Sequence, residues 1–169
     1  MRSAVRDLGR GTLKIGLISD THGLLRPEAL AALAGCEHLI HAGDIGSRSD
    51  RHNGVLDTLA NIAPLTVVRG NNDRAGWAAA IPHTADLEFG GVRIHVLHIL
   101  GELAIDPAAA GVQVVVSGHS HKPCMETRRG VLYVNPGSAG PRRFRLPVTV
   151  ARLTVACGRV DAELVTLLE

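Results

Sequence analysis

The sequence predicts an α/β protein in which two mixed β-sheets pack face to face with helices outside. The first half of the 169-residue chain alternates apolar strands with helices, which is typical of parallel strands joined by right-handed crossovers. The second half is a series of short strands joined by tight turns, which is typical of antiparallel pairs. No repeat, linker or low-complexity segment separates the two halves, so we expect a single domain over residues 1–169.

The first half predicts a β-α-β-α-β order. An apolar run rich in Leu and Ile begins at Leu13 and stops at Asp20, as expected for a strand buried on both faces. A helix should follow, because residues 26–34 are rich in Ala, carry Pro27 in the first turn and meet Gly35 where a helix commonly ends. The remaining elements are a strand at residues 38–42, a helix at 55–60 and a strand at 65–69.

The second half predicts three hairpins and one buried strand. Residues 84–89 and 92–97 are strands that flank the turn signal Gly90-Gly91. Residues 106–111 form a short helical turn, and the apolar run 112–117 is a buried strand. The last two hairpins pair residues 125–128 with 131–134, and residues 148–155 with 159–168.

Composition narrows the classes of function. The net charge is only +2, and one Trp, one Tyr and two Phe give little surface for stacking bases, so we expect no stable nucleic-acid partner. The N-terminus lacks the apolar core of a signal peptide, and no apolar run approaches the roughly 20 residues that cross a bilayer. We therefore expect a cytoplasmic protein with no membrane partner, in which residues 1–12 form a poorly ordered N-terminal extension. Three widely spaced cysteines argue against a disulfide framework and a thiolate zinc site.

Five predicted strands end in side chains that commonly bind metals. In extended geometry two residues of the same parity, such as Asp20 and His22, point to one side of the chain. Each motif taken alone has a structural explanation, such as an N-cap aspartate followed by a surface histidine. Because the pattern repeats at five strand ends, it favours two divalent cations that share one bridging carboxylate. The candidate ligands are Asp20, His22, Asp44, Asn71, His98, His119 and His121.

The order of these motifs resembles the calcineurin-like metallophosphoesterase superfamily, specifically its small bacterial and archaeal phosphodiesterases. The resemblance runs from about residue 13 to residue 142 and includes the turn of residues 135–138. It implies an αββα sandwich and a hydroxide that bridges two metal ions and attacks a phosphodiester. It also implies that Asp20, His22 and His121 hold one metal, that Asn71, His98 and His119 hold the other, and that Asp44 bridges them.

Two residues depart from the family pattern. Asn72 stands where many relatives have a His thought to protonate the leaving group, and an amide cannot be a general acid. Ile99 stands where the family usually has Gly, and a branched side chain there alters the backbone options next to His98. The candidate catalytic residues are Asn72 and Asp73. Asn72 could donate a hydrogen bond to a phosphate oxygen. For Asp73 we favour a role in orienting a neighbouring backbone or ligand over a role as a base.

Several alternatives stay open at this point. The metals are expected to be manganese first, with Fe, Ni, Co or Zn also suited to such oxygen and nitrogen ligands. The substrate is expected to be a small-molecule phosphate ester, as a diester or else as a monoester. A non-catalytic, metal-binding scaffold of the same fold, like a retromer subunit, is the rival function. Self-association into a homo-oligomer is left open.

Overall fold

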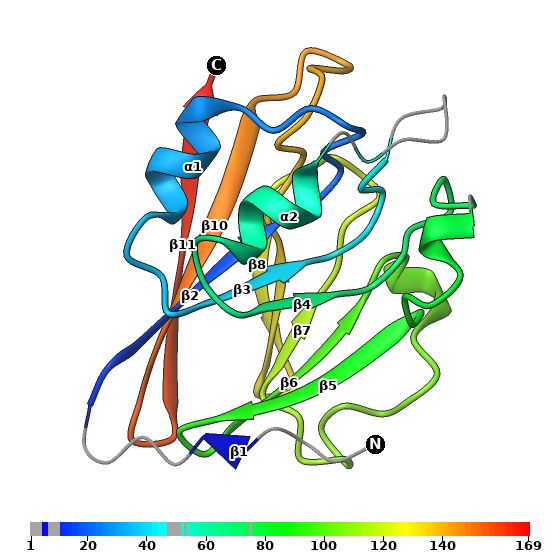
Figure 1. The fold of residues 1–169 in the computed structure, drawn as a ribbon. Helices are drawn as coiled ribbons and strands as arrows, with labels where there is room; N and C mark the ends of the chain where they lie inside the picture. The colour runs from blue at the N-terminus through cyan, green and yellow to red at the C-terminus, as the bar shows by residue number, and fades with distance from the viewer. Residues whose placement is uncertain (1–4, 7–10, 47–51, 53, 75) are drawn as a thin grey trace.

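The computed structural model describes residues 5–6, 11–46, 52, 54–74 and 76–169, and it contains two β-sheets packed face to face (Figure 1). The first, here called the helix-covered sheet, has the strand order β11-β10-β2-β3-β4. Its strands are β11 (Arg159–Leu168), β10 (Val148–Ala156), β2 (Leu13–Ile18), β3 (His38–His41) and β4 (Leu65–Val67). The second sheet has the order β1-β5-β6-β7-β9-β8. Its strands are β1 (Val5–Arg6), β5 (Thr84–Phe89), β6 (Val92–Leu97), β7 (Val114–Val116), β9 (Val131–Asn135) and β8 (Cys124–Arg128). Two mixed sheets confirm the predicted fold class.

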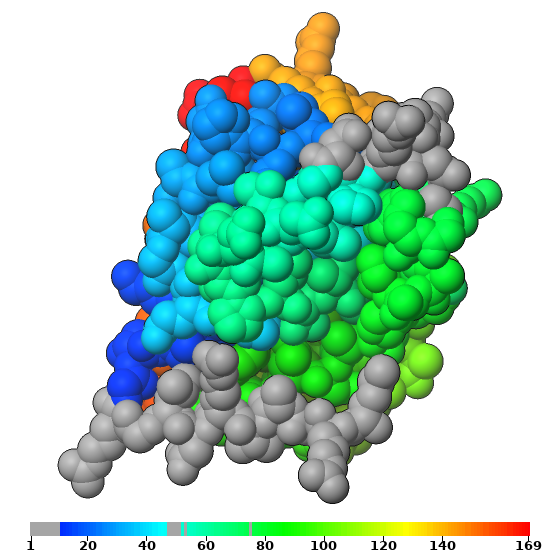
Figure 2. Space-filling model, in the orientation of Figure 1, coloured from blue at the N-terminus to red at the C-terminus, as the bar shows by residue number. Residues whose placement is uncertain are grey.

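In the described part of the chain two α-helices lie on the outer face of the helix-covered sheet (Figure 1), and their residues cover much of the side of the molecule that Figure 2 shows. Helix α1 (Pro27–Leu33) begins with Pro27, and α2 (Val55–Ala60) follows Gly54, whose φ of 73° is left-handed. Strands β2, β3 and β4 are parallel, so each helix is a crossover between neighbouring strands. Gly16 of β2 allows this packing, because a Cβ there would lie 2.5 Å from Leu33 of α1.

The second sheet is mixed, and its outer face is covered differently. Strands β6, β7 and β9 are parallel, whereas β5 and β8 pair antiparallel with β6 and β9. Among the described residues no α-helix covers this sheet. A 3-10 helix, η2 (Leu100–Glu102), and the turn of residues 107–111 pack there instead, against Leu97, Val115 and Tyr133. The sandwich therefore has one thick and one thin outer layer. A second 3-10 helix, η1 (Gly76–Ala78), follows the loop after β4.

The main core lies between the two sheets. Leu17 and Ile40 of the helix-covered sheet meet Ile94 and Val116 of the second sheet, and all four are 0–1% exposed. These positions come from short apolar strands buried on both faces, as the sequence indicated.

Most of the predicted N-terminal extension lies outside the described residues. Within it, Val5–Arg6 forms β1, which pairs in parallel with the end of β5. No helix in the described part of the chain has the length and apolar character needed to span a bilayer.

Candidate metal centre

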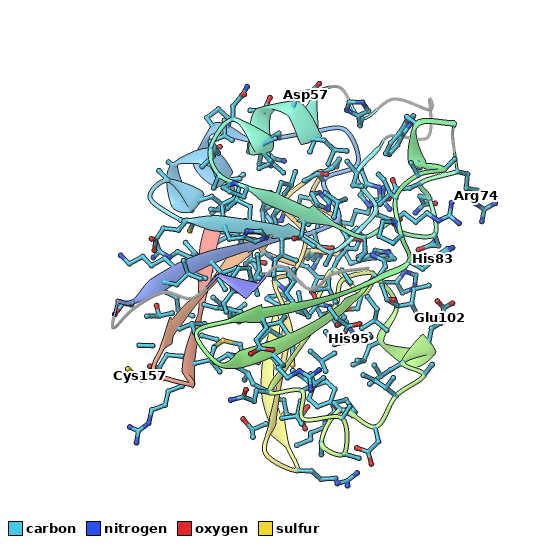
Figure 3. All side chains as sticks on the ribbon, turned by 60° about the horizontal axis from the view of Figure 1, so that its bottom comes forward. Asp57, Arg74, His83, His95, Glu102 and Cys157 are labelled. Carbon is cyan, nitrogen blue, oxygen red and sulfur yellow. The ribbon has the colours of Figure 1, made fainter. Side chains whose placement is uncertain are left out.

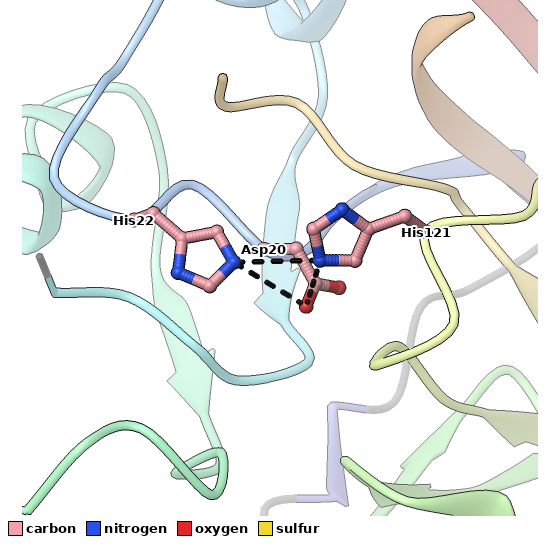
Figure 4. Close-up of side chains that lie close together, drawn as sticks. All are labelled: Asp20, His22 and His121. Carbon is pink, nitrogen blue, oxygen red and sulfur yellow. Dashed lines mark hydrogen bonds and ion pairs between the residues drawn. The ribbon is translucent and has the colours of Figure 1, made fainter. Parts of the chain in front are cut away.

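The seven predicted ligands lie in loops that follow strands at one end of the sandwich. The first group consists of Asp20 and His22, which follow β2, and His121, which follows β7. Nε2 of His121 lies 3.3 Å from Oδ1 of Asp20 and 3.4 Å from Nε2 of His22 (Figure 4). The three side chains thus point their donor atoms at one point, although His121 is about a hundred positions away along the chain.

The second group is built from three other loops. Oδ1 of Asn71 lies 3.1 Å from Nε2 of His98 and 3.0 Å from Nδ1 of His119. Nδ1 of His98 lies 2.7 Å from the carbonyl oxygen of Ala42, which accepts its proton and leaves Nε2 free as a ligand atom. One amide oxygen and two imidazole nitrogens therefore face a second point.

Asp44 lies between the two groups. Its Oδ2 is 3.9 Å from Nε2 of His22, and its Oδ1 is 3.5 Å from Nε2 of His98. A carboxylate in this position can contact a cation in either group with a different oxygen. This arrangement fits the bridging role that the resemblance implied.

The buried carboxylate of Asp20 shows whether a cation fits this site. Its side chain is fully buried, and its Oδ2 accepts hydrogen bonds from the hydroxyl of Ser19 at 2.6 Å and the backbone N–H of His119 at 3.1 Å. Its Oδ1 accepts no hydrogen bond from any described residue and faces His22, His98 and His121. A buried carboxylate oxygen is costly without a partner, so the donor set fits a divalent cation at this atom.

The electrostatics of the site keep Asp44 ionised. Burial opposes ionisation, but the imidazole of His98 and two N–H groups of Asn72 outweigh it and hold the pKa of Asp44 well below its usual range. Burial also lowers the pKa of His98, but Asp44 and Asp20 outweigh it and raise that pKa. Burial and the nearby charge of Arg143 lower the pKa of His22 by more than Asp44 and Asp20 raise it. This favours the neutral imidazole that a metal requires.

The backbone at the site differs from the sequence prediction. We expected Asp20 and His22 to share one side of an extended strand, but β2 ends at Ile18, so that expectation is wrong. Both residues are left-handed, with φ of 53° and 46°, and so are Asp44, His119 and His121, at 54°, 69° and 58°. Such a backbone costs roughly 1–2 kcal/mol for a residue other than glycine. The side chains converge because tight loops turn them inward, held by surrounding contacts.

Neighbouring glycines allow the loops to approach this closely. A Cβ on Gly118 would overlap the hydroxyl of Ser19, and a Cβ on Gly70 would overlap the carboxylate of Asp44. The Gly residues in the motifs Gly43-Asp44, Gly70-Asn71 and Gly118-His119 thus provide room for the ligand beside them or for its neighbours.

The two candidate catalytic residues make different contacts. Asn72 donates to Asp44 twice: its backbone N–H to Oδ1 at 2.9 Å and its side-chain amide to Oδ2 at 2.6 Å. Asp73 is 3% exposed and accepts hydrogen bonds from the backbone N–H groups of Ile45, Gly46 and Gly70. It therefore fastens the Asp44 loop to the Asn71 loop, a geometry that favours the orienting role over that of a base.

The turn of residues 135–138 also supports the ligands. The amide of Asn135 donates to the carbonyl of Gly118 at 2.8 Å, and the hydroxyl of Ser138 donates to the carbonyl of Asp20 at 3.0 Å. The sequence identified this segment as a turn but gave no role to Ser19. Its position directly before Asp20 was the available signal, because a hydroxyl there can reach the neighbouring carboxylate.

His41 lies behind the site and is neutral. The backbone N–H of Gly43 donates to Nδ1 of His41, so the proton lies on Nε2, 2.9 Å from the hydroxyl of Thr21, which donates to the carbonyl of Ile45. Burial lowers the pKa of His41 to about 3. It is a hydrogen-bonded core residue at the end of β3.

Known proteins resemble this chain both in sequence and in fold. Residues 13–158 match the family model of the calcineurin-like phosphoesterase superfamily domain. A probable metallophosphoesterase of Methanocaldococcus jannaschii is 31% identical over 94% of this chain and 84% of its own length. Among solved structures, vacuolar protein sorting 29 of Cryptosporidium parvum superposes with a TM-score of 0.71 at 17% identity, covering 94% of this chain and 99% of that one. The phosphoesterase YfcE of E. coli gives 0.66 at 21% identity, covering 92% and 100%.

Proposed function

The chain belongs to the calcineurin-like phosphoesterase superfamily, and we propose that it is a dinuclear metal-dependent phosphodiesterase acting on small-molecule phosphate esters. The observation that carries the proposal is the buried Oδ1 of Asp20, which accepts no hydrogen bond from the described residues and faces three imidazoles. A buried carboxylate oxygen is costly unless a cation binds it, so this atom supports a metal centre, and turnover is the property that separates an enzyme from a metal-binding scaffold.

In this proposal the two groups of side chains hold one divalent cation each, with manganese as the first candidate. Asp20, His22 and His121 hold one ion, Asn71, His98 and His119 hold the other, and Asp44 is shared. Two divalent cations against the two carboxylates leave a net charge of +2, which attracts a phosphate anion. When bound, the ions supply the Lewis acidity that activates water and neutralises the charge of the phosphate.

The chain's own residues orient this site and limit its substrates. Asn72 holds Asp44 through both its backbone and its side chain, and its amide carries no transferable proton. A leaving group must then depart without protonation from this position. We therefore propose a preference for diesters whose alcohol has a low pKa.

The test is an assay of bis(p-nitrophenyl) phosphate after chelation and reloading with manganese, nickel or zinc. Turnover should depend on the metal, and metal analysis should give two ions per chain. Asp44→Asn should lower the rate at least about 100-fold while circular dichroism stays unchanged, because the shared carboxylate loses its charge. The matched control is Asp57→Asn on the exposed surface of α2, which should keep full activity.

Three results would change the conclusion. Full activity in Asp44→Asn would contradict the shared role of that carboxylate. Faster hydrolysis of p-nitrophenyl phosphate than of the diester would favour a phosphomonoesterase. Tight metal binding without turnover of either ester would favour the scaffold, an alternative that fits the structural likeness to vacuolar protein sorting 29.

A further inference from the structure

A cavity of 530 Å³ lies on the outer face of the second sheet, and Leu100 and Gly101 of η2 are part of its lining. His119 of the candidate metal centre is part of its wall, so the cavity adjoins that centre. Its volume is within the range of small-molecule sites. We propose that this cavity holds the organic group of the substrate ester and selects an apolar, aromatic or branched group; this rests on the proposed function.

The lining is mainly apolar. Its apolar lining residues include Ile99, Leu100, Pro123, Tyr133 and Val134. Apolar walls bind an organic group by removing its surface from water, and the apolar part of this wall offers no hydrogen bonds to the hydroxyls of a sugar. An aryl or branched alkyl ester is therefore favoured over a sugar phosphate.

The polar groups in the wall are largely occupied by one another. Arg128 pairs with Glu126 at 2.7 Å, and its guanidinium lies 5.2 Å from the ring centre of Tyr133. The amide of Asn135 donates to the carbonyl of Gly118 and to the hydroxyl of Ser120. Lys122 is exposed, and its ammonium group contacts no described residue within hydrogen-bond distance, so one unpaired positive charge lines the cavity. This distribution matches an ester that is anionic at one end and apolar at the other.

Ile99 separates this cavity from a second one of 260 Å³, which Asn71 and His98 line. Its φ of −102° and ψ of 109° are ordinary extended backbone, so the branched side chain is accommodated without strain. A glycine here would leave the two cavities without this wall. The departure from the family pattern at Ile99 thus gives the proposed subsite a defined boundary.

Cysteine accessibility tests the proposal without turnover. Cys124 lines the cavity and is exposed, Cys157 is exposed in the turn between β10 and β11, and Cys36 is buried. Figure 3 shows Cys157 on the opposite side of the molecule from Glu102 of η2. Cys124 therefore reports on the cavity, and Cys157 serves as the control in the same molecule.

The experiment follows alkylation by iodoacetamide in the manganese-loaded protein with mass spectrometry. The probe is 1-naphthylmethylphosphonate, whose P–C bond is not hydrolysed, and the comparison is methylphosphonate. The naphthyl compound should slow alkylation of Cys124 at least 5-fold, whereas methylphosphonate should not, and Cys157 should react equally throughout. In calorimetry, Cys124→Trp should weaken binding of the naphthyl compound at least 10-fold and leave methylphosphonate unchanged, and Cys157→Trp should change neither.

Equal protection by both phosphonates, or protection of neither cysteine, would overturn the proposal. If a diester is hydrolysed but Cys124 is not protected, the phosphodiesterase stands and the subsite is wrong. If Cys124 is selectively protected but no ester is hydrolysed, the apolar subsite is supported and the proposed reaction fails.

Discussion

Replacing Asp73 with Ala should release the loop that carries Asp44 from the loop that carries Asn71. The carboxylate is 3% exposed and accepts hydrogen bonds from Ile45 N–H at 2.9 Å, Gly46 N–H at 3.0 Å and Gly70 N–H at 2.8 Å. A hydrogen bond to a charged group contributes roughly 1.5–3 kcal/mol. We take three such bonds at the low end of that range and allow for water that partly replaces the lost hydrogen bonds. The expected loss of unfolding free energy is then about 4 kcal/mol.

Urea unfolding of the chelator-treated protein, followed by circular dichroism, measures this loss. Asp57→Ala on α2 is the matched control and should change the stability by less than about 0.5 kcal/mol, because Asp57 is exposed. Asp73→Asn should lose less unfolding free energy than Asp73→Ala but more than the control. Its amide oxygen can still accept hydrogen bonds, whereas its amide N–H groups face backbone donors. A loss below about 1 kcal/mol for Asp73→Ala would refute the reasoning. Unchanged stability with abolished turnover in Asp73→Asn would instead identify a catalytic base.

Three further predictions concern His41, Gly118 and Asn72. The pKa of His41 is about 3 in the folded protein against 6.5 for a free side chain, so the unfolded chain binds the extra proton below pH 6.5 and stability falls as the pH falls. The loss of unfolding free energy is about 2 kcal/mol between pH 7.5 and 5, and urea unfolding in the presence of a chelator should show it. The His41→Asn protein should lose less unfolding free energy over the same interval. An identical loss would contradict the low pKa of His41. Gly118→Ala should weaken metal binding at least about 10-fold in calorimetry, because the added Cβ would displace Ser19 and Asp20. Gly76→Ala, which has open space around it, should bind the metal normally. Equal affinities of the two variants would contradict the idea that Gly118 leaves room for these side chains. In the wild type, the hydrolysis rate of aryl diesters should fall steeply as the leaving-group pKa rises, and Asn72→His should flatten that dependence; a flat wild-type profile would indicate another acid.

Most strands and helices could be read from the sequence, although β2 ends at Ile18 and β7 covers only Val114–Val116. The hairpin strands β5 and β6 begin and end where predicted, because Gly90-Gly91 is a strong local turn signal and both glycines are left-handed. The apolar runs that end at Asp20 and Asp44 indicated buried strands followed by polar loops. The seven candidate ligands could be named because each lies within five residues of the end of a strand, so local order placed them at one edge.

Only the tertiary structure decided how these residues meet. The left-handed backbone at Asp20 and His22 depends on hydrogen bonds from residues 20, 22 and 23 to the carbonyls of residues 43–45, and no local pattern encodes those bonds. The contacts of Asp73 with Ile45 and Gly46 join two loops 27 and 28 positions apart. The thin layer over the second sheet, with its cavity, was likewise invisible in the sequence. Local propensity acts between neighbours along the chain, whereas the orientation of each ligand depends on partners that only folding brings within reach.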